Sequence, residues 1–230
     1  MLIFSYIKKI IYGIVVAFFA STILSVILFR FVPVPITPLM LIRVTEQLKE
    51  GKDIKLKHSW VSIEKINPAM QKAVIASEDA HFLSHHGFDL EAIQKAAKRN
   101  KKHPEKRILG GSTITQQTAK NVFLWPKRSW VRKGLEAYFT VLIELTWPKK
   151  RIIEVYLNSI EMGDGIYGVE AVAKEHFNSS ADRLTEADCA LIAATLPNPR
   201  RFSSLHPSPY IKKRQHRILN EMKHVTEIPK

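Results

Sequence analysis

Residues 67–87 read NPAMQKAVIASEDAHFLSHHG, and this stretch indicates the kind of fold to expect. Asn67 is a good helix cap and the proline after it suits a first helical turn, so a helix is predicted to begin there. Met70, Val74 and Glu78 follow at intervals of four residues, which places a carboxylate on the same face as core residues. Two carboxylates and three histidines then gather where this helix gives way to a glycine. The stretch predicts a helical scaffold with ionisable groups at a helix end.

Glu78 is the candidate general base of this cluster. On an apolar helix face, burial raises the pKa of a carboxyl group and makes it a better proton acceptor. A solvated helix end without chemical role is the alternative, and spacing alone does not decide between the two. The three histidines, His81, His85 and His86, lack a recognised zinc pattern with a partnered glutamate, which argues against a metal site at this point.

Working outward, most of the remaining chain also shows helical periodicity. Four further helices are predicted from capping residues that precede apolar positions at helical spacing: Asp89, Thr113, Ser129 and Thr185. The pattern that Ser129 opens stops at Pro148 and resumes as another helix through Leu157. A short strand is predicted only around residues 58–63, and residues 101–111 and 197–209 resist regular structure. The fold class expected is mainly α.

Charge and cysteine content narrow the function. The chain has 230 residues with 35 basic and 21 acidic side chains, a formal net charge of +14. Such a surface attracts polyanions, and nucleic acid, anionic lipid and phosphorylated substrates all remain candidates on charge alone. Cys189 is the single cysteine, so an intramolecular disulfide and a cysteine-rich zinc site are both excluded.

An uncharged, apolar run lies near the N-terminus, at residues 10–29. Twenty helical residues span about 30 Å, the thickness of a bilayer core, so a transmembrane helix is predicted. A cleaved signal peptide is the alternative, but its apolar core is usually only about 7–15 residues long. Lys8 and Lys9 favour a cytoplasmic N-terminus. We predict a cytoplasmic segment 1–9, an anchor 10–30, a juxtamembrane spacer 31–54 and a catalytic domain 55–230. The proline-rich residues 32–38 of the spacer are predicted to be stiff and extended.

Two further motifs carry chemistry. Residues 110–121 read GGSTITQQTAKN, a double glycine that leads into a helix N-terminus, where free amides and the helix dipole attract anions. Lys120 and Arg128 are the candidates to complete a phosphate cradle, although a glycine before a capped helix also has a purely structural explanation. In Arg132-Lys133-Gly-Leu-Glu136, an ordinary i, i+4 ion pair is the alternative to a catalytic role.

Together these motifs resemble the signature motifs of the peptidoglycan glycosyltransferase family, in order and in spacing. The resemblance covers roughly residues 55–199 and is closest to the monofunctional Gram-negative type, because we find no transpeptidase domain with a Ser-x-x-Lys nucleophile. The matching motifs are Glu78-Asp79-x-x-Phe82-x-x-His85-x-Gly87, residues 110–121, Arg132-Lys133-x-x-Glu136, residues 150–158 and residues 163–171.

The resemblance implies a lysozyme-like helical glycosyltransferase domain with one transmembrane anchor. It implies that lipid II is polymerised into β-1,4-linked strands by inverting transfer, with release of undecaprenyl pyrophosphate. Glu78 is then the base, Glu136 is a second catalytic residue and a candidate metal ligand, and Lys120, Arg128 and Arg132 are the pyrophosphate ligands. The other residues assigned to substrate binding are Asp79, Phe82, His85, Gly111, Ser112, Thr113, Gln116, Gln117, Asn121 and Lys133.

The resemblance also implies the setting of the enzyme. We expect an inner-membrane, single-pass protein with its catalytic domain in the periplasm. Expected partners are lipid II, the growing lipid-linked strand and cell-division or cell-wall synthesis proteins, but no nucleic acid. A divalent cation, Mg or Mn, is a candidate cofactor, and no organic cofactor is expected. The rival hypotheses are a lysozyme-like peptidoglycan hydrolase and a membrane-tethered protein that binds anionic polymers.

Overall fold

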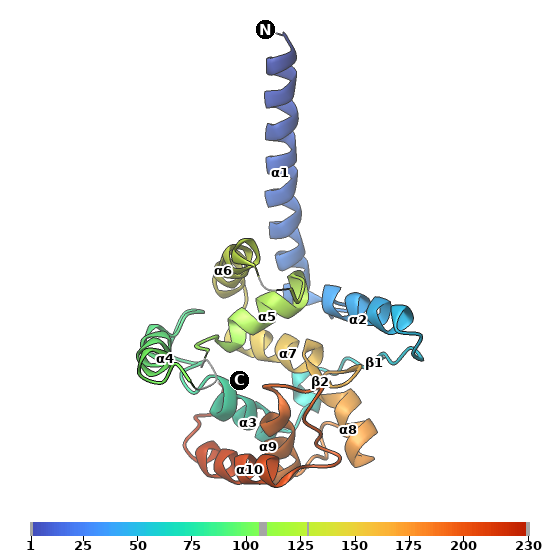
Figure 1. Cartoon of the computed structure of the whole chain (residues 1–230), viewed down its shortest axis with the longest axis vertical. Coiled ribbons are helices and arrows are strands. Elements are labelled where there is room, and N and C mark those ends of the chain that lie inside the picture. Colours follow the sequence, from blue (N-terminus) through green and yellow to red (C-terminus); the bar gives the residue numbers. More distant parts are fainter. Residues whose placement is uncertain (1, 106–109, 128, 229–230) are drawn as a thin grey trace.

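The computed structural model describes residues 2–105, 110–127 and 129–228, and the chain is mainly helical, as predicted (Figure 1). Helix α1 (Leu2–Phe31) stands out from the body, which lies at its C-terminal end. Its segment Phe4–Phe31 is long and apolar enough to cross a membrane. The helix begins earlier than the predicted anchor, because residues 2–9 contain no proline or glycine that would end it.

Within the predicted spacer, the proline-rich part has no helix at residues 33–37, and a helix that was not predicted follows it. This helix is α2 (Pro38–Lys49), capped by Thr37, whose hydroxyl accepts a hydrogen bond from the Met40 amide at 3.3 Å. Val34 and Met40 are almost completely buried. The prolines do end α1, but Pro38 at a first helical turn favours a new helix, and the apolar side chains then pack onto the body.

In the described part of the chain, eight more helices build the body. The caps predicted at Asn67, Asp89, Thr113, Ser129 and Thr185 all begin helices, while α8 and α10 were not predicted. The eight helices are α3 (Pro68–Glu78), α4 (Leu90–Lys102), α5 (Ile114–Phe123), α6 (Trp130–Thr146), α7 (Lys149–Ser159), α8 (Val169–Phe177), α9 (Glu186–Thr195) and α10 (Pro209–Met222).

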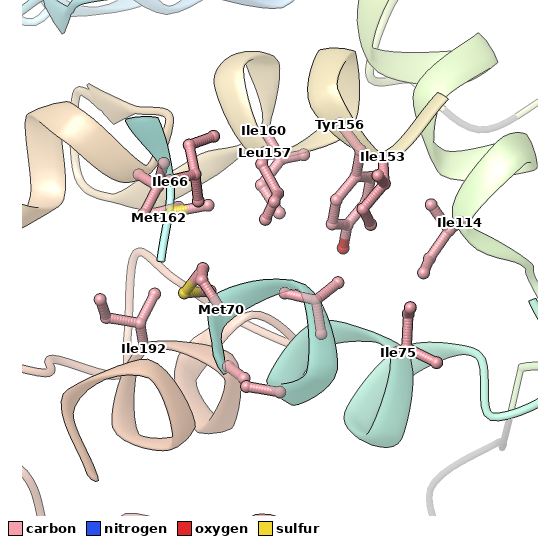
Figure 2. Packing of buried hydrophobic residues seen from close by; sticks show 14 of the residues in the cluster. Ile66, Met70, Ile75, Ile114, Ile153, Tyr156, Leu157, Ile160, Met162 and Ile192 are labelled. Atoms are coloured by element: carbon pink, nitrogen blue, oxygen red, sulfur yellow. The ribbon is translucent and has the colours of Figure 1, made fainter. Parts of the chain in front are cut away.

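The core forms where α3, α5, α7 and α9 meet. Figure 2 shows Ile153 and Tyr156 of α7 facing Ile75 of α3 and Ile114 of α5. All four side chains are essentially without exposed surface. Burial of residues this large is the main favourable term in folding, and it fixes α3 against the other helices. The base candidate at the end of α3 is therefore held by a rigid scaffold.

A small three-stranded sheet pairs the segment before η1 with the segment between α7 and α8. Strand β1 (Lys57–His58) runs parallel to β3 (Ile166–Tyr167), which pairs antiparallel with β2 (Glu161–Gly163). The predicted strand at residues 58–63 is thus shorter than expected, and its end becomes a 3-10 turn, η1 (Ile63–Lys65). The β2–β3 hairpin was not predicted, because its strands are too short to show alternation.

Helix α4 departs from the expected packing. The apolar residues of an amphipathic helix usually face the core, yet Leu90 and Ile93 are 68% and 40% exposed, and Ala96 is the buried position of this helix. Five basic residues share this short helix, at positions 95, 98, 99, 101 and 102. It extends to Lys102, so the predicted irregular segment 101–111 begins later than expected, and residues 106–109 of it lie outside the described residues.

The anchor helix is docked on the body. The Trp147 indole donates a hydrogen bond to the Val26 carbonyl at 2.8 Å, and the hydroxyls of Thr22 and Tyr138 lie 2.9 Å apart. Arg151 donates from Nε and Nη2 to the Phe29 carbonyl, at 3.0 and 2.9 Å. These contacts fix the last turns of α1 against α6 and α7.

Candidate active site

Glu78 lies at the last turn of α3 with its carboxylate in a polar cage. Gln117 donates to its Oε2 at 3.1 Å and Ser77 donates to its Oε1 at 3.1 Å. The guanidinium of Arg214 lies 3.7 Å from Oε1. Burial raises the pKa of Glu78, and the hydrogen bond from Gln117 and the charge of Arg214 oppose that rise. The prediction that this carboxyl is desolvated is confirmed.

Asp79 links the first motif, residues 78–87, to the second, residues 110–121. Its carboxylate accepts a hydrogen bond from His85 Nε2, at 2.8 and 3.0 Å to its two oxygens, and from the Ile114 amide at 2.9 Å. His85 Nδ1 in turn accepts from the Gly87 amide at 3.1 Å. Both Asp79 and His85 are almost fully buried. These two predicted substrate ligands therefore hold the loop after α3 against the start of α5.

Phe82 also supports the site from the interior of the protein. It has no exposed surface, so it packs under the loop and offers substrate no contact in this structure. The ammonium group of Lys149 lies 4.7 Å from the centre of its ring and donates to the His85 carbonyl at 2.7 Å. Glu78 of the first motif thus faces a cavity, whereas Phe82, His85 and most of the Asp79 side chain form a buried frame that positions it.

The start of α5 differs from the predicted phosphate cradle. The Ile114 amide is bound by Asp79, and the Gln116 amide is bound by the Thr113 hydroxyl at 3.2 Å. The Thr113 amide is bound by the Gln116 side chain at 3.0 Å, which completes the predicted capping box. These three amides already have acceptors inside the protein, so they are not free to bind an anion in this structure.

Glycine is required just before this helix. A Cβ atom at Gly111 would lie 3.0 Å from the Cα atom of Ile93, so a side chain there would push α4 away. Ser112, the next residue, is exposed and lines the cleft. Gly111 is thus placed to let α4 approach the start of α5, with Ser112 facing the open side.

A second buried carboxylate lies on α6. Glu136 is 3% exposed and pairs with Arg132, whose Nη1 is 3.0 Å from Oε2, and with Lys133. The predicted i, i+4 ion pair is confirmed. Burial lowers the pKa of Lys120, while the charge of Glu136 is the largest influence that raises it. Three cations therefore surround one carboxylate, which leaves this corner of the site electropositive.

Two cavities that share Ser112 lie between the two carboxylates, and a third adjoins the second of them. One of about 280 Å³ is lined by Glu78, His81 and Ser112, and one of about 380 Å³ by Ser112, Gln117, Lys120 and the Arg132–Glu136 group. A third, of about 240 Å³, shares Gln117 and Lys120 with the second and extends past Asn121. Ser112, Gln117 and Lys120 thus lie where cavities meet, between the base candidate and the cationic corner.

The structure brings most of the predicted site residues together. The predicted residues that line one of the three cavities are Glu78, Asp79, Gly111, Ser112, Thr113, Gln116, Gln117, Lys120, Asn121, Arg132, Lys133 and Glu136. Phe82 and His85 line none of the three and support the site from inside. The predicted pyrophosphate ligand Arg128 lies outside the described residues. Arg214 and Ser77 were missed, because Arg214 sits in a basic run far from the motifs and Ser77 has no pattern of its own.

Comparison with known proteins agrees with this site. Residues 45–223 match the family model described as transglycosylase. The chain therefore belongs to the transglycosylase family, and the expectation of a lysozyme-like helical domain is confirmed.

Several curated relatives carry a more specific name. A biosynthetic peptidoglycan transglycosylase of Bacteroides thetaiotaomicron is 59% identical over 217 residues, which cover 94% of this chain and 87% of the relative. Proteins of the same name from Bdellovibrio bacteriovorus and Caulobacter vibrioides are 57% and 54% identical, over 90% and 86% of this chain and 82% and 83% of their own lengths.

Proposed function

We propose that this transglycosylase is a peptidoglycan glycosyltransferase of cell-wall synthesis that polymerises lipid II into β-1,4-linked glycan strands. The observation that carries the proposal is one cleft with a desolvated carboxylate, Glu78, at one end and a group of three cations around Glu136 at the other. The Glu78 carboxylate can accept the proton that a sugar hydroxyl must lose, and the cations around Glu136 can neutralise the charge of a departing pyrophosphate.

Glu78 is assigned the role of general base. A sugar hydroxyl is a poor nucleophile, and a buried carboxylate with a raised pKa accepts its proton more readily than a solvated one. As the 4-hydroxyl oxygen bonds to the anomeric carbon of the donor, its proton passes to the Glu78 carboxylate and the bond to pyrophosphate breaks. A single displacement of this kind inverts an α linkage to β and needs no covalent enzyme intermediate.

Lys120, Arg132 and Lys133 are assigned to the pyrophosphate. They line the same cavity as Glu136, and guanidinium and ammonium groups neutralise charge that builds on a leaving group. Glu136 holds Arg132 and Lys133 in place, so we assign it to orienting these cations. This polyanion site is the feature that separates a pyrophosphate-releasing polymerase from a lysozyme-like hydrolase, whose leaving group carries no such charge.

The predicted divalent cation has weaker support. Both carboxylate oxygens of Glu136 are already paired with cations, and no three His, Cys, Asp or Glu side chains gather among the described residues. The residues present do not fit an ion held by protein ligands alone, so no step is assigned to one. Polymerisation measured with and without a chelator, and again after Mg or Mn is restored, tests the requirement.

The anchor explains how enzyme and substrate meet. We propose an inner-membrane location with the catalytic body in the periplasm, supported by the apolar segment Phe4–Phe31 and by Lys8 and Lys9 before its central part. The polyprenyl tail of lipid II stays in the bilayer, and docking of α1 on α6 and α7 holds the cleft at a fixed height above it. Contacts with cell-division or cell-wall synthesis proteins stay a prediction.

The experiment that tests the function uses the purified full chain in detergent with lipid II. Wild type should form long glycan and release undecaprenyl pyrophosphate, and Glu78→Gln should lose at least about 10²-fold in rate, the usual contribution of a general base. Full turnover by Glu78→Gln would reject Glu78 as the base. Short soluble fragments in place of polymer would identify a hydrolase, and salt-sensitive duplex binding without polymerisation would favour the anionic-polymer binder.

A further inference from the structure

Arg214 lies in the last helix of the chain, far in sequence from the motifs, yet its side chain reaches the base. Its Nη2 is 3.7 Å from Glu78 Oε1 and donates to the Ser77 hydroxyl at 3.3 Å. The Ser77 hydroxyl lies 3.1 Å from the same Glu78 oxygen, as a donor to it. One direct ion pair and one relay through Ser77 therefore connect the guanidinium to the carboxylate.

Burial makes this contact significant. The side chains of Arg214 and Glu78 are 16% and 14% exposed, so water screens their attraction only weakly. The other arginine of the same helix, Arg217, is exposed instead: its side chain is 63% exposed and pairs with Glu221 one turn away. An ion pair of that exposed kind contributes little, whereas a buried guanidinium beside a buried carboxylate strongly affects both groups.

Arg214 has few other partners. Within the described chain its Nε atom has no hydrogen-bond acceptor, and its ion pair is with Glu78. A guanidinium that served only to hold α10 in place would be expected to satisfy its donors on backbone or surface carboxylates. The geometry instead directs its charge toward the carboxylate that the reaction uses.

Other charged groups also face Glu78, from each element around it. Lys120 of α5 favours the ionised carboxylate of Glu78. Burial raises the pKa of Tyr156 of α7, and the charges of Glu78 and Asp79 add to that rise. Burial raises the pKa of Glu78, and Arg214 lowers it more than Lys120 does. Arg214 is thus the largest cationic influence on this carboxyl.

We propose that Arg214 is a positioning residue for the catalytic base: together with Ser77 it orients the Glu78 carboxylate and keeps it ionised, ready to accept the proton of the attacking hydroxyl. The inference rests on the proposed function of Glu78. It assigns to α10 a part in the reaction that the motifs between residues 78 and 171 do not contain.

The test is the pH profile of kcat/KM for lipid II polymerisation by the full chain. Arg214→Gln removes the charge, so the acid limb should move to higher pH, with roughly a fivefold to tenfold loss at its acid end that shrinks toward alkaline pH. KM should change little. Arg214→Lys keeps a cation and should restore much of the acid limb. Arg217→Gln, on the exposed side of α10, should match wild type at every pH.

Two results would overturn the proposal. A loss in Arg214→Gln that is equal at all pH values, with a lowered melting temperature, would show that Arg214 only supports the packing of α10. An unchanged profile would show that it has no role in the reaction. The proposed function fails separately, because full polymerisation by Glu78→Gln would reject the base itself, whereas an inactive Glu78→Gln with an unshifted Arg214→Gln rejects only the role of Arg214.

Discussion

The buried carboxylate of Asp79 should stabilise the fold, and its removal should show this directly. In Asp79→Ala, two hydrogen bonds to the carboxylate are lost, one from His85 Nε2 and one from the Ile114 amide. Both donors are then buried without an acceptor. The substitution therefore removes the hydrogen bonds that hold the loop after α3 against the start of α5.

The expected magnitude follows from these two bonds. Each buried donor left unsatisfied costs about 1–3 kcal/mol, and bonds to a charged acceptor lie at the upper end. The sum is about 4 kcal/mol in the free energy of unfolding, which corresponds to a fall of roughly 10 °C in melting temperature for a chain of this size. Asp79→Asn keeps one carbonyl acceptor, so its cost should be about half.

Denaturant unfolding of the full chain in detergent measures the change, with the glycan assay beside it. The control is Glu91→Ala, which removes an exposed i, i+4 pair with Lys95 and should alter the free energy of unfolding by less than about 0.5 kcal/mol. If Asp79→Ala unfolds within about 1 kcal/mol of wild type yet loses polymerisation, the structural reasoning is refuted, and Asp79 serves substrate directly as the sequence resemblance implied.

Three further changes test other parts of the structure. Arg151→Ala removes the hydrogen bonds to the Phe29 carbonyl, so limited proteolysis should cut residues 32–37 faster than in wild type; an unchanged cleavage rate would contradict docking of the anchor. Gly168→Ala should lower the free energy of unfolding by about 2–4 kcal/mol, because φ is +80° and the new Cβ would lie 2.6 Å from the Asn158 carbonyl oxygen. Its control is Gly134→Ala, which has open space inside a helix and should raise the free energy of unfolding by about 0.5–1 kcal/mol in the same measurement. Glu78→Gln should melt at a higher temperature than wild type at pH 8, because burial raises the pKa of Glu78 and the ionised form disfavours folding; the difference should narrow as the pH falls toward 4.5, and a constant difference would contradict it.

Local sequence signals account for much of the fold. Helix starts were predictable where a capping side chain that satisfies the first amides precedes an apolar pattern, as at Asn67, Thr113 and Ser129. Thr37 and Ser208 cap α2 and α10 in the same way, yet these helices and α8 were not predicted, and the β2–β3 hairpin is very short. Their stability comes from packing against distant parts of the chain, which local periodicity does not record.

The motifs identified the site but not the division of tasks within it. Glu78 as a desolvated carboxyl and the Arg132–Glu136 ion pair follow from helical spacing, and the structure confirms both. By contrast, Asp79 and Phe82 stand beside Glu78 in the same motif, yet the fold turns them inward. A sequence motif does not record which way each side chain points. Only the structure shows whether a side chain faces the cleft or packs behind it.

The sequence by itself determined a basic, mainly helical transglycosylase with an apolar N-terminal helix and a glutamate at the end of a core helix, because composition, capping and periodicity are local properties. Only the tertiary structure decided what surrounds that glutamate. The amides at the start of α5 are occupied by Asp79 and the capping box, and Arg214 arrives from α10, 136 positions after Glu78. Such contacts depend on how whole helices pack, and no spacing along the chain encodes them.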